Sequence, residues 1–187
     1  LLDQNPNDQA TLLAVTLELV FRLGQLADPK AISPYAKDYS PLSLLLHSQF
    51  QLAKAILVTP NQAINLFRVY LKTLPLFSVP RSINLVNADI NASNIWLTGR
   101  ELYLTDWEEV GWGIAGYNIV GPLSVHWNTP KVKELLYSRS LVPLLAYRIL
   151  VLFSQRLKLT DPRRKRDYAL LREINLGDFR DVATGKK

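Results

Sequence analysis

Cysteine and methionine are both absent from this chain of 187 residues. Without cysteine, the protein has no disulfide bond, no thiolate metal site and no cysteine nucleophile. Because methionine is missing even at position 1, we expect Leu1 not to be the first residue of the gene product. The opening Leu-Leu-Asp-Gln-Asn lacks the basic region that begins a signal peptide, so we expect a cytoplasmic protein.

Long uninterrupted hydrophobic runs are missing as well. The most apolar stretch, residues 140–158, contains Pro143 and Arg148. It is too short and too charged to span a membrane, so we expect a buried helix there and no membrane span. Hydrophobic residues make up 48% of the chain and charged residues 20%, which is typical of one globular domain with a core.

The net charge is +6, which suits an acidic partner such as a nucleotide, a nucleic acid or an anionic surface. Much of the excess lies in "DPRRKRD", residues 161–167. A basic run of this kind is usually the solvated start of a helix. It has no interleaved aromatic residues, so we expect no nucleic-acid binding.

Helical hydrophobic periodicity covers most of the chain. We expect helices at about 8–26, 41–58, 59–75, 117–125, 130–158 and 162–174, with a loop at 27–41 and a frayed tail from about residue 175. The first helix is apolar around most of its circumference, which predicts burial. Thr59 is expected to be the N-cap of its helix, with Pro60 in the first turn.

The periodicity changes to that of strands in the middle of the chain. Residues 83–86 form a short apolar strand, and "NIWLT" and "ELYLTD" are joined by Thr98-Gly99-Arg100, which predicts a β-hairpin. The fold class is therefore α+β, mainly α, with a small central β-hairpin. A hairpin between buried helices usually presents a loop with a function.

Three polar residues surround this hairpin. Asp89 follows the first strand, Asn94 begins the hairpin, and Asp106 ends it. A hairpin brings its two ends together, so we expect these side chains to point into one open cleft. Mg²⁺ prefers oxygen ligands and takes one or two protein carboxylates, which Asp106 and Asn94 could satisfy. Asp89 would then accept a proton from a hydroxyl. The alternative is that these residues only cap strands and turns.

The ordered set of motifs resembles one enzyme family. "NADINASN" followed by "LTDWEEVGWG" is similar to the H-G-D-x-x-x-x-N … I-D-W-E signature of the aminoglycoside phosphotransferase and choline kinase-like family, small-molecule kinases with a protein-kinase-like fold. The resemblance is close over about residues 82–123. It implies that residues 1–187 form a single C-terminal lobe. It also implies Asp89 as the catalytic base, Asn94 and Asp106 as Mg²⁺ ligands, and ATP and Mg²⁺ as cofactors.

By the same resemblance, the reaction transfers the γ-phosphoryl group of ATP to a hydroxyl of a small molecule. Asn87, Glu108 and Asn118 would support the site. Asn87 stands where the family has histidine, Ala88 where it has glycine, and Asn118 where an aspartate is usual. The family's N-terminal ATP-binding lobe has no counterpart in the chain. The alternative function is therefore a degenerate, kinase-like pseudoenzyme that acts as a protein-binding or assembly module.

The remaining candidates are aromatic residues and histidines. Trp107, Trp112 and Trp127 could line a substrate pocket, although such residues are more often core. His47 and His126 are expected to be structural, because no second ligand lies at metal-binding spacing. No G-x-S-x-G motif supports a serine hydrolase.

Two expectations concern partners. The face around Trp107, Trp112 and the first helix should be apolar, covered by a missing lobe or by a partner protein. The chain alone should bind Mg-ATP weakly and turn nothing over, because the family holds ATP between two lobes.

Overall fold

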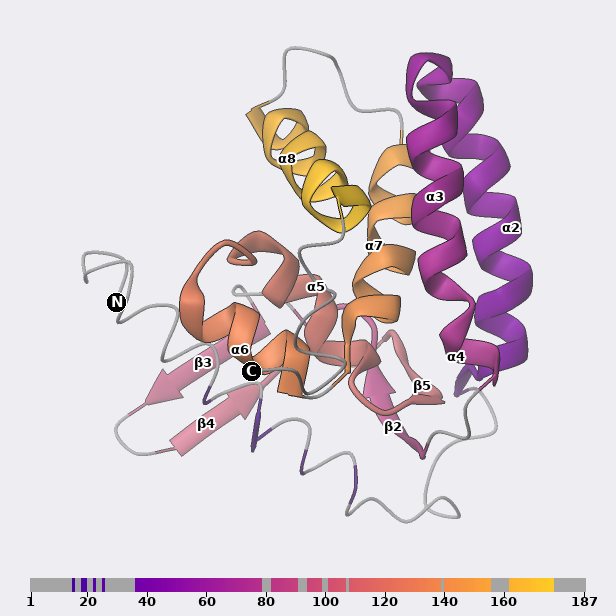
Figure 1. Ribbon diagram of the computed structural model, residues 1–187. Helices are drawn as coiled ribbons and strands as arrows, with labels where there is room; N and C mark the ends of the chain where they lie inside the picture. The colour runs from indigo at the N-terminus through magenta and orange to yellow at the C-terminus, as the bar shows by residue number, and fades with distance from the viewer. Residues whose placement is uncertain are drawn as a thin grey trace. The chain divides into compact units, whose positions relative to one another are not determined.

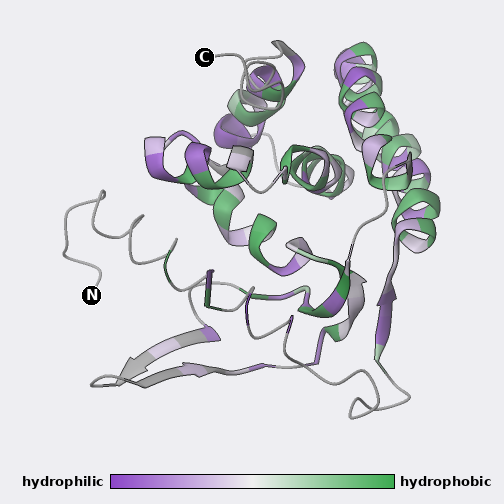
Figure 2. Cartoon of the chain, turned by 60° about the horizontal axis from the view of Figure 1, so that its bottom comes forward, coloured by the Kyte–Doolittle hydropathy of each residue, from purple (hydrophilic) through white to green (hydrophobic). Residues whose placement is uncertain are grey.

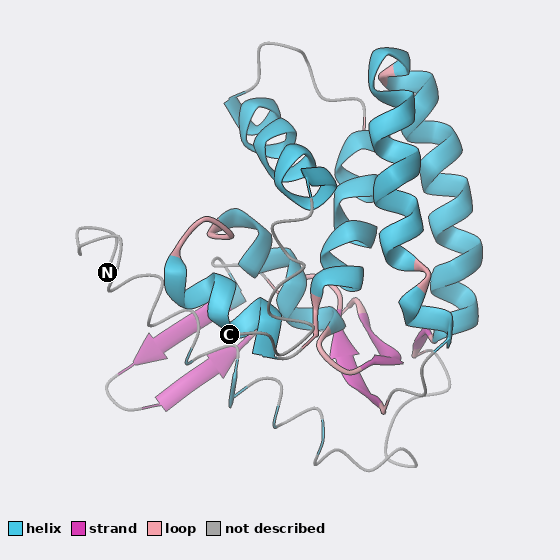
Figure 3. Cartoon of the chain, viewed as in Figure 1, coloured by secondary structure: helices cyan, strands magenta, loops and turns pink. Residues whose placement is uncertain are grey.

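The computed structural model describes residues 15, 18, 19, 22, 25, 36–78, 82–90, 94–98, 101–106, 108–138, 140–155 and 162–176. The described chain is mainly helical with two small sheets (Figure 3), which confirms the α+β, mainly α class. The chain divides into two compact units, Leu1–Pro41 with Arg81–Val132, and Leu42–Pro80 with Lys133–Lys187. The single lobe over residues 1–187 stays a prediction.

The first unit contains both sheets and helix α5 (Tyr117–Val125). Its strands are β1 (Lys37–Tyr39), β2 (Ile83–Asn87), β3 (Ile95–Thr98), β4 (Glu101–Leu104) and β5 (Val110–Ile114). The larger sheet has the order β1-β5-β2, with β1 parallel and β2 antiparallel to β5. Strands β3 and β4 pair antiparallel, which confirms the predicted hairpin.

Two of these strands correct the sequence analysis. Strand β1 lies in residues 27–41, where a loop was predicted, and β5 was not predicted at all. Gly111 and Gly113 of β5 weaken its strand pattern, but the pairing needs them. A Cβ on Gly111 would lie 2.1 Å from the carbonyl oxygen of Lys37, and one on Gly113 would lie 2.5 Å from the Cβ of Tyr39.

The second unit is helical. It contains α2 (Pro41–Val58, with its first residue in the other unit), η2 (Pro60–Gln62), α3 (Ala63–Thr73), α4 (Pro75–Ser78), α7 (Val142–Ser154) and α8 (Pro162–Leu176). Helices α2, α3 and α7 run side by side (Figure 1). The core lies around α7, whose buried residues include Leu145, Ile149 and Phe153. None of the described helices is long and apolar enough to cross a membrane.

The predicted helix over residues 130–158 is wrong, because the chain breaks into α6 (Pro130–Ser138) and α7. The break is consistent with Pro143, because a proline ring is unfavourable in the interior of a helix and is tolerated in a first turn. Pro143 lies in the first turn of α7, and Ser140 just before it has a left-handed φ of 52°. The boundary between the two units falls within α6, after Val132.

Thr59 occupies the predicted N-cap position, with Pro60 next to it, but the turn that it begins is the 3₁₀ turn η2, and its side chain makes no capping hydrogen bond there. The Thr59 hydroxyl instead donates to the carbonyl of Ala55 at 2.9 Å. Thr59 therefore satisfies the end of α2 rather than the beginning of α3. Helix α2 itself matches its predicted bounds, and α8 reaches Leu176, slightly past the predicted start of the tail.

Of the predicted helix at 8–26, residues 15, 18, 19, 22 and 25 are helical, and the rest lies outside the described residues. Val15 and Leu19 are about half exposed, so the predicted burial is wrong at these two positions. Glu18 and Arg22 form an i,i+4 ion pair at 3.3 Å.

Apolar side chains are exposed on α2 and α3, which carry hydrophobic residues along their length (Figure 2). On α3, Leu66 and Val69 are buried, whereas Ile64, Phe67 and Leu71 are exposed. The apolar residues of α3 are therefore divided between the core and the surface. The expected apolar face around Trp107 and Trp112 cannot be followed at Trp107, which lies outside the described residues.

Candidate functional site

The site is built on the end of β2. Strand β2 pairs with β5 up to Asn87, which lies opposite Val110. The amide of Ala88 donates to the carbonyl of Glu109 at 3.0 Å and continues the ladder by one bond. The turn that carries Asp89 therefore starts from a fixed strand end, as residues that position a catalytic group should.

The side chain of Asn87 links two parts of the site. It is buried, with 2% exposed. Its Nδ2 donates to the carbonyl oxygen of Asp106 at 2.9 Å, and its Oδ1 accepts from the backbone N–H of Asp89 at 3.0 Å. One amide group thus joins the turn after β2 to the segment after β4.

Asn94 makes the next link. Its Nδ2 donates to the carbonyl oxygen of Asp89 at 2.9 Å, while its own carbonyl accepts from the backbone N–H of Thr105 at 3.0 Å. Asn94 directly precedes β3, and Thr105 directly follows β4. The two ends of the hairpin and the turn after β2 are therefore joined by hydrogen bonds through Asn87 and Asn94.

The two candidate carboxylates in this network, those of Asp89 and Asp106, are exposed. Asp106 has a φ of 60°, in the left-handed region that aspartate adopts more readily than most residues. Such a backbone persists where surrounding contacts impose it, as the bond from Asn87 does here. The structure joins the backbones of Asp89, Asn94 and Asp106; a shared cleft for their side chains stays a prediction.

A metal at this end of the hairpin would be held by the carboxylate of Asp106 and the amide oxygen of Asn94. No group of three or more histidine, cysteine, aspartate or glutamate side chains suited to a metal occurs among the described residues. One carboxylate and one amide are nevertheless hard oxygen donors of the kind that Mg²⁺ takes, with water and substrate completing its coordination. The residues therefore fit Mg²⁺ chemically.

The predicted supporting residues fall into different environments. Glu108 is exposed, and Asn118, in the first turn of α5, is 5% exposed. In the described part of the chain, Asn118 Oδ1 is buried without a hydrogen-bond partner. Asn87 therefore uses both of its polar atoms, whereas Asn118 leaves one unsatisfied.

Sequence reasoning missed a cluster around Glu109. Lys37 forms an ion pair with Glu109, and the Tyr39 hydroxyl donates to Glu109 Oε2 at 3.1 Å. The hydrogen bond from Lys37 lowers the pKa of Glu109, while burial, and next the bond to Glu109, raise the pKa of Tyr39. Tyr39 also stacks on Tyr117, with ring centroids 4.8 Å apart. The cluster fastens β1 to the segment between Asp106 and β5.

The tryptophans that could line a substrate pocket lie in different environments. Trp127 is buried, with 8% exposed, and Trp112 of β5 is half-buried. Trp107 lies outside the described residues. These environments are those of core and sheet residues, and a substrate pocket formed by the three stays a prediction.

His47 agrees with its predicted structural role. Its ring nitrogens lie within hydrogen-bonding distance of the Tyr147 hydroxyl and the Gln51 amide. Burial lowers the pKa of His47, which favours the neutral ring. His126 is half-buried directly after α5.

Comparisons of the chain with protein-family models, with curated proteins and with solved structures find no match in any of the three.

Proposed function

We propose that this chain is the C-terminal lobe of a kinase-like phosphotransferase, which transfers the γ-phosphoryl group of ATP to a hydroxyl of a small molecule. The observation that carries the proposal is the hydrogen-bond network through Asn87 and Asn94. Turn capping alone requires only local bonds, whereas Asn87 reaches 19 residues along the chain to Asp106. The network supports a site in which the loops of Asp89 and Asp106 keep a fixed separation.

Each residue has a defined role in the reaction. The acceptor hydroxyl oxygen attacks the γ-phosphorus, the bond between the γ-phosphorus and the bridging oxygen breaks, and ADP leaves with the electron pair. Asp89 accepts the hydroxyl proton. Asp106 and Asn94 would hold Mg²⁺, which when bound neutralises phosphate charge. Asn87 positions the loops of the base and of the metal ligand through its two hydrogen bonds.

A metal-binding experiment tests the site on this chain. Mn²⁺ is a paramagnetic substitute for Mg²⁺, so its binding can be followed by electron paramagnetic resonance. We expect Asp106→Asn to weaken Mn²⁺ binding by about tenfold or more, because loss of a metal-site interaction typically has that size. The control is Glu134→Gln, which removes an exposed carboxylate from α6 and should leave binding unchanged. Equal Mn²⁺ affinities for the wild type and both variants would remove the metal site.

Transfer itself is tested on the natural gene product. Asp89→Ala should abolish phosphate transfer from ATP while the circular dichroism spectrum stays that of the wild type. The 187-residue chain alone should bind Mg-ATP weakly, and micromolar ATP affinity by calorimetry would contradict that expectation.

A second function, an assembly module, is favoured by the apolar surface of α2 and α3. The exposed residues on α3 and just after it have the 3-4-3 spacing of a coiled-coil seam. They are Ile64, Phe67, Leu71 and Leu74. On α2 the exposed apolar residues are Leu42, Leu46, Phe50 and Leu57. Exposed apolar stripes of this length usually mark an interaction surface.

The partner that best fits this seam is a second copy of the chain, because seams of this spacing pack against like seams. Sedimentation of the wild type should then give a dimer, and the double variant Phe67→Ser with Leu71→Ser a monomer. The control is Lys54→Ser on α2, which removes an exposed polar residue and leaves every apolar side chain of the stripe in place. A wild type that stays monomeric at high concentration would exclude the dimer and leave the phosphotransferase proposal untouched.

A further inference from the structure

A polar groove lies in the helical unit, and none of its lining residues belongs to the hairpin network. It has a volume of about 440 Å³ and opens between α8 and the segment formed by η2 and α3. Its lining residues are Gln62, Asn65, Arg68, Tyr168, Leu171, Arg172 and Asn175. The volume lies within the range of small-molecule sites, about 300–1,000 Å³.

The charged residues that line the groove are both positive. Arg68 and Arg172 are exposed on its two walls, and no aspartate or glutamate is among the described residues that line it. In the described part of the chain, neither guanidinium makes an ion pair or a hydrogen bond. Two arginines that face one groove without a carboxylate repel each other, and an anion between them would remove that cost.

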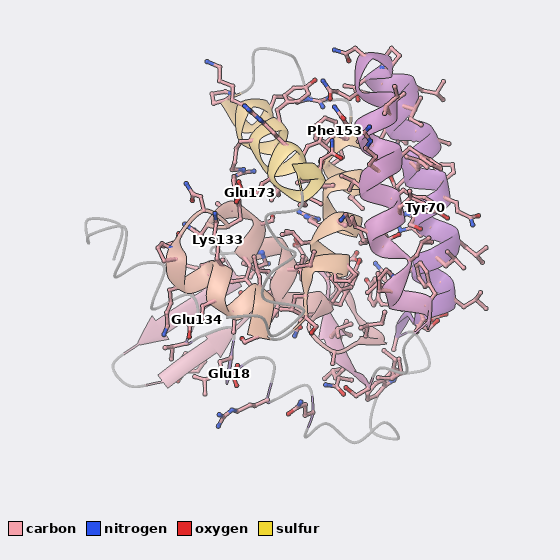
Figure 4. The ribbon with its side chains drawn as sticks, in the orientation of Figure 1. Glu18, Tyr70, Lys133, Glu134, Phe153 and Glu173 are labelled. Atoms are coloured by element: carbon pink, nitrogen blue, oxygen red, sulfur yellow. The ribbon has the colours of Figure 1, made fainter. Side chains whose placement is uncertain are left out.

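The two acidic residues of α8 are paired with another residue or buried. Glu173, next to Arg172 in the sequence, accepts a hydrogen bond from Lys133 Nζ at 2.7 Å, and both side chains are labelled in Figure 4. Asp167 is buried, with 1% exposed, and lies 3.6 Å from Arg166. The positive charge of the groove is therefore not balanced from its own helix.

The remaining lining groups are fixed in orientation. Asn175 Nδ2 donates to Asn65 Oδ1 at 2.7 Å, and Asn65 Nδ2 donates to Gln62 Oε1 at 2.8 Å. The ring of Tyr168 packs edge-on against Phe153, with centroids 5.1 Å apart and planes at 85°. The groove thus has a preordered chain of amides beside its arginines, which lowers the entropic cost of binding a polar ligand.

From these features we propose that the groove binds a small organic phosphate. Arginine presents planar donors that match a phosphate group, and a pair of arginines can hold its oxygens from two sides. The hydroxyl groups of the ligand would bond to the amides of Gln62 and Asn175 and to the hydroxyl of Tyr168. This site uses no residue of the proposed phosphotransfer reaction and needs no divalent metal.

Titration of the 187-residue chain with glycerol 3-phosphate, inorganic phosphate and glycerol, without divalent ions, tests the proposal. Binding is measured by calorimetry and by the ¹⁵N NMR shifts of arginine side chains. We expect glycerol 3-phosphate to bind most tightly, inorganic phosphate more weakly, and glycerol not at all. Each of Arg68→Gln and Arg172→Gln should weaken glycerol 3-phosphate binding about tenfold, because hydrogen bonds to charged groups have that magnitude.

The matched control is Lys54→Gln, which removes one positive charge from an exposed position of α2 in the same unit. It should leave binding unchanged. Glutamine favours helices nearly as well as arginine and lysine, so all three variants should fold. An equal loss in the control, or no shift in either arginine, would overturn the site. Equal affinity for inorganic phosphate and glycerol 3-phosphate would overturn the assignment to an organic phosphate.

Discussion

Replacing Asn87 by alanine is the sharpest test of the hairpin network. The change removes a donor to the carbonyl of Asp106 and an acceptor from the N–H of Asp89, at 2.9 and 3.0 Å. A typical intramolecular hydrogen bond contributes about 0.5–1.5 kcal/mol net, so the two together should contribute about 1–3 kcal/mol. Because Asp89 and Asp106 are exposed, water can replace part of the lost hydrogen bonding. We therefore expect Asn87→Ala to reduce the local free energy of opening by about 1–2 kcal/mol.

The same strand offers a matched control. Asn84 is also buried on β2, with 8% exposed, but its Nδ2 has no hydrogen-bond partner in the described part of the chain. Removing an unsatisfied buried donor should cost nothing or stabilise the protein slightly. Asn84→Ala and Asn87→Ala therefore remove the same type of side chain from one strand. We expect a loss of stability in Asn87→Ala and no loss in Asn84→Ala.

Amide hydrogen exchange is the appropriate assay, because it reports each segment separately, whereas denaturant unfolding of a chain with two compact units need not be two-state. In Asn87→Ala, exchange at the Asp89 amide should accelerate about 5- to 30-fold, the equivalent of about 1–2 kcal/mol. Exchange in α7 should not change. Unchanged exchange at Asp89, or an equal effect of Asn84→Ala, would show that the network does not hold the site.

The remaining predictions concern packing and titration. Gly111→Ala should destabilise the first unit by several kcal/mol in denaturant unfolding, because the added Cβ would lie 2.1 Å from a carbonyl oxygen of β1. Gly121→Ala in α5 should instead stabilise the protein by about 0.5–1 kcal/mol, because the added Cβ would meet nothing within 4 Å. Burial raises the pKa of Asp167 above its ordinary 3.8, so the unfolding free energy should fall, relative to that of Asp167→Asn, as the pH rises through the folded pKa. The hydrogen bond from Lys37 lowers the pKa of Glu109 below its ordinary 4.5. The stabilisation that ionised Glu109 gives the folded protein should therefore be present above pH 4.5 and disappear as the pH falls through the lowered pKa. Glu109→Gln should lack this acid dependence, and a profile identical to that of the wild type would contradict the assignment.

Helix α2 and the hairpin could be predicted because their signals are local. Helix α2 has Pro41 in its first turn and helical periodicity throughout, and the hairpin needs only a short turn between two apolar runs. Strand β1 has three residues, too few for a pattern. Its partner β5 comes more than 70 residues later, and pairing over that distance leaves no trace in a single sequence.

The site shows the same division. Asp89, Asn94 and Asp106 could be placed together, because the ends of a hairpin always meet. The cluster of Lys37, Tyr39 and Glu109 could not, because it depends on β1. The glycines of β5 were a usable signal: two glycines at alternate positions beside a tryptophan indicate close approach of another backbone as well as a loop.

The asparagines at positions 87 and 118 have different physical consequences. Asn87 stands where the phosphotransferases that the chain resembles have a histidine, and it both donates and accepts, so the loops of Asp89 and Asp106 are linked. Asn118 stands where those enzymes usually have an aspartate, and it buries a carbonyl oxygen without a partner in the described part of the chain, which costs about 1–3 kcal/mol. A loss of activity would therefore originate at Asn118 rather than at Asn87. A module that no longer catalyses has no need of the link between the two loops, and the link through Asn87 is what favours the phosphotransferase.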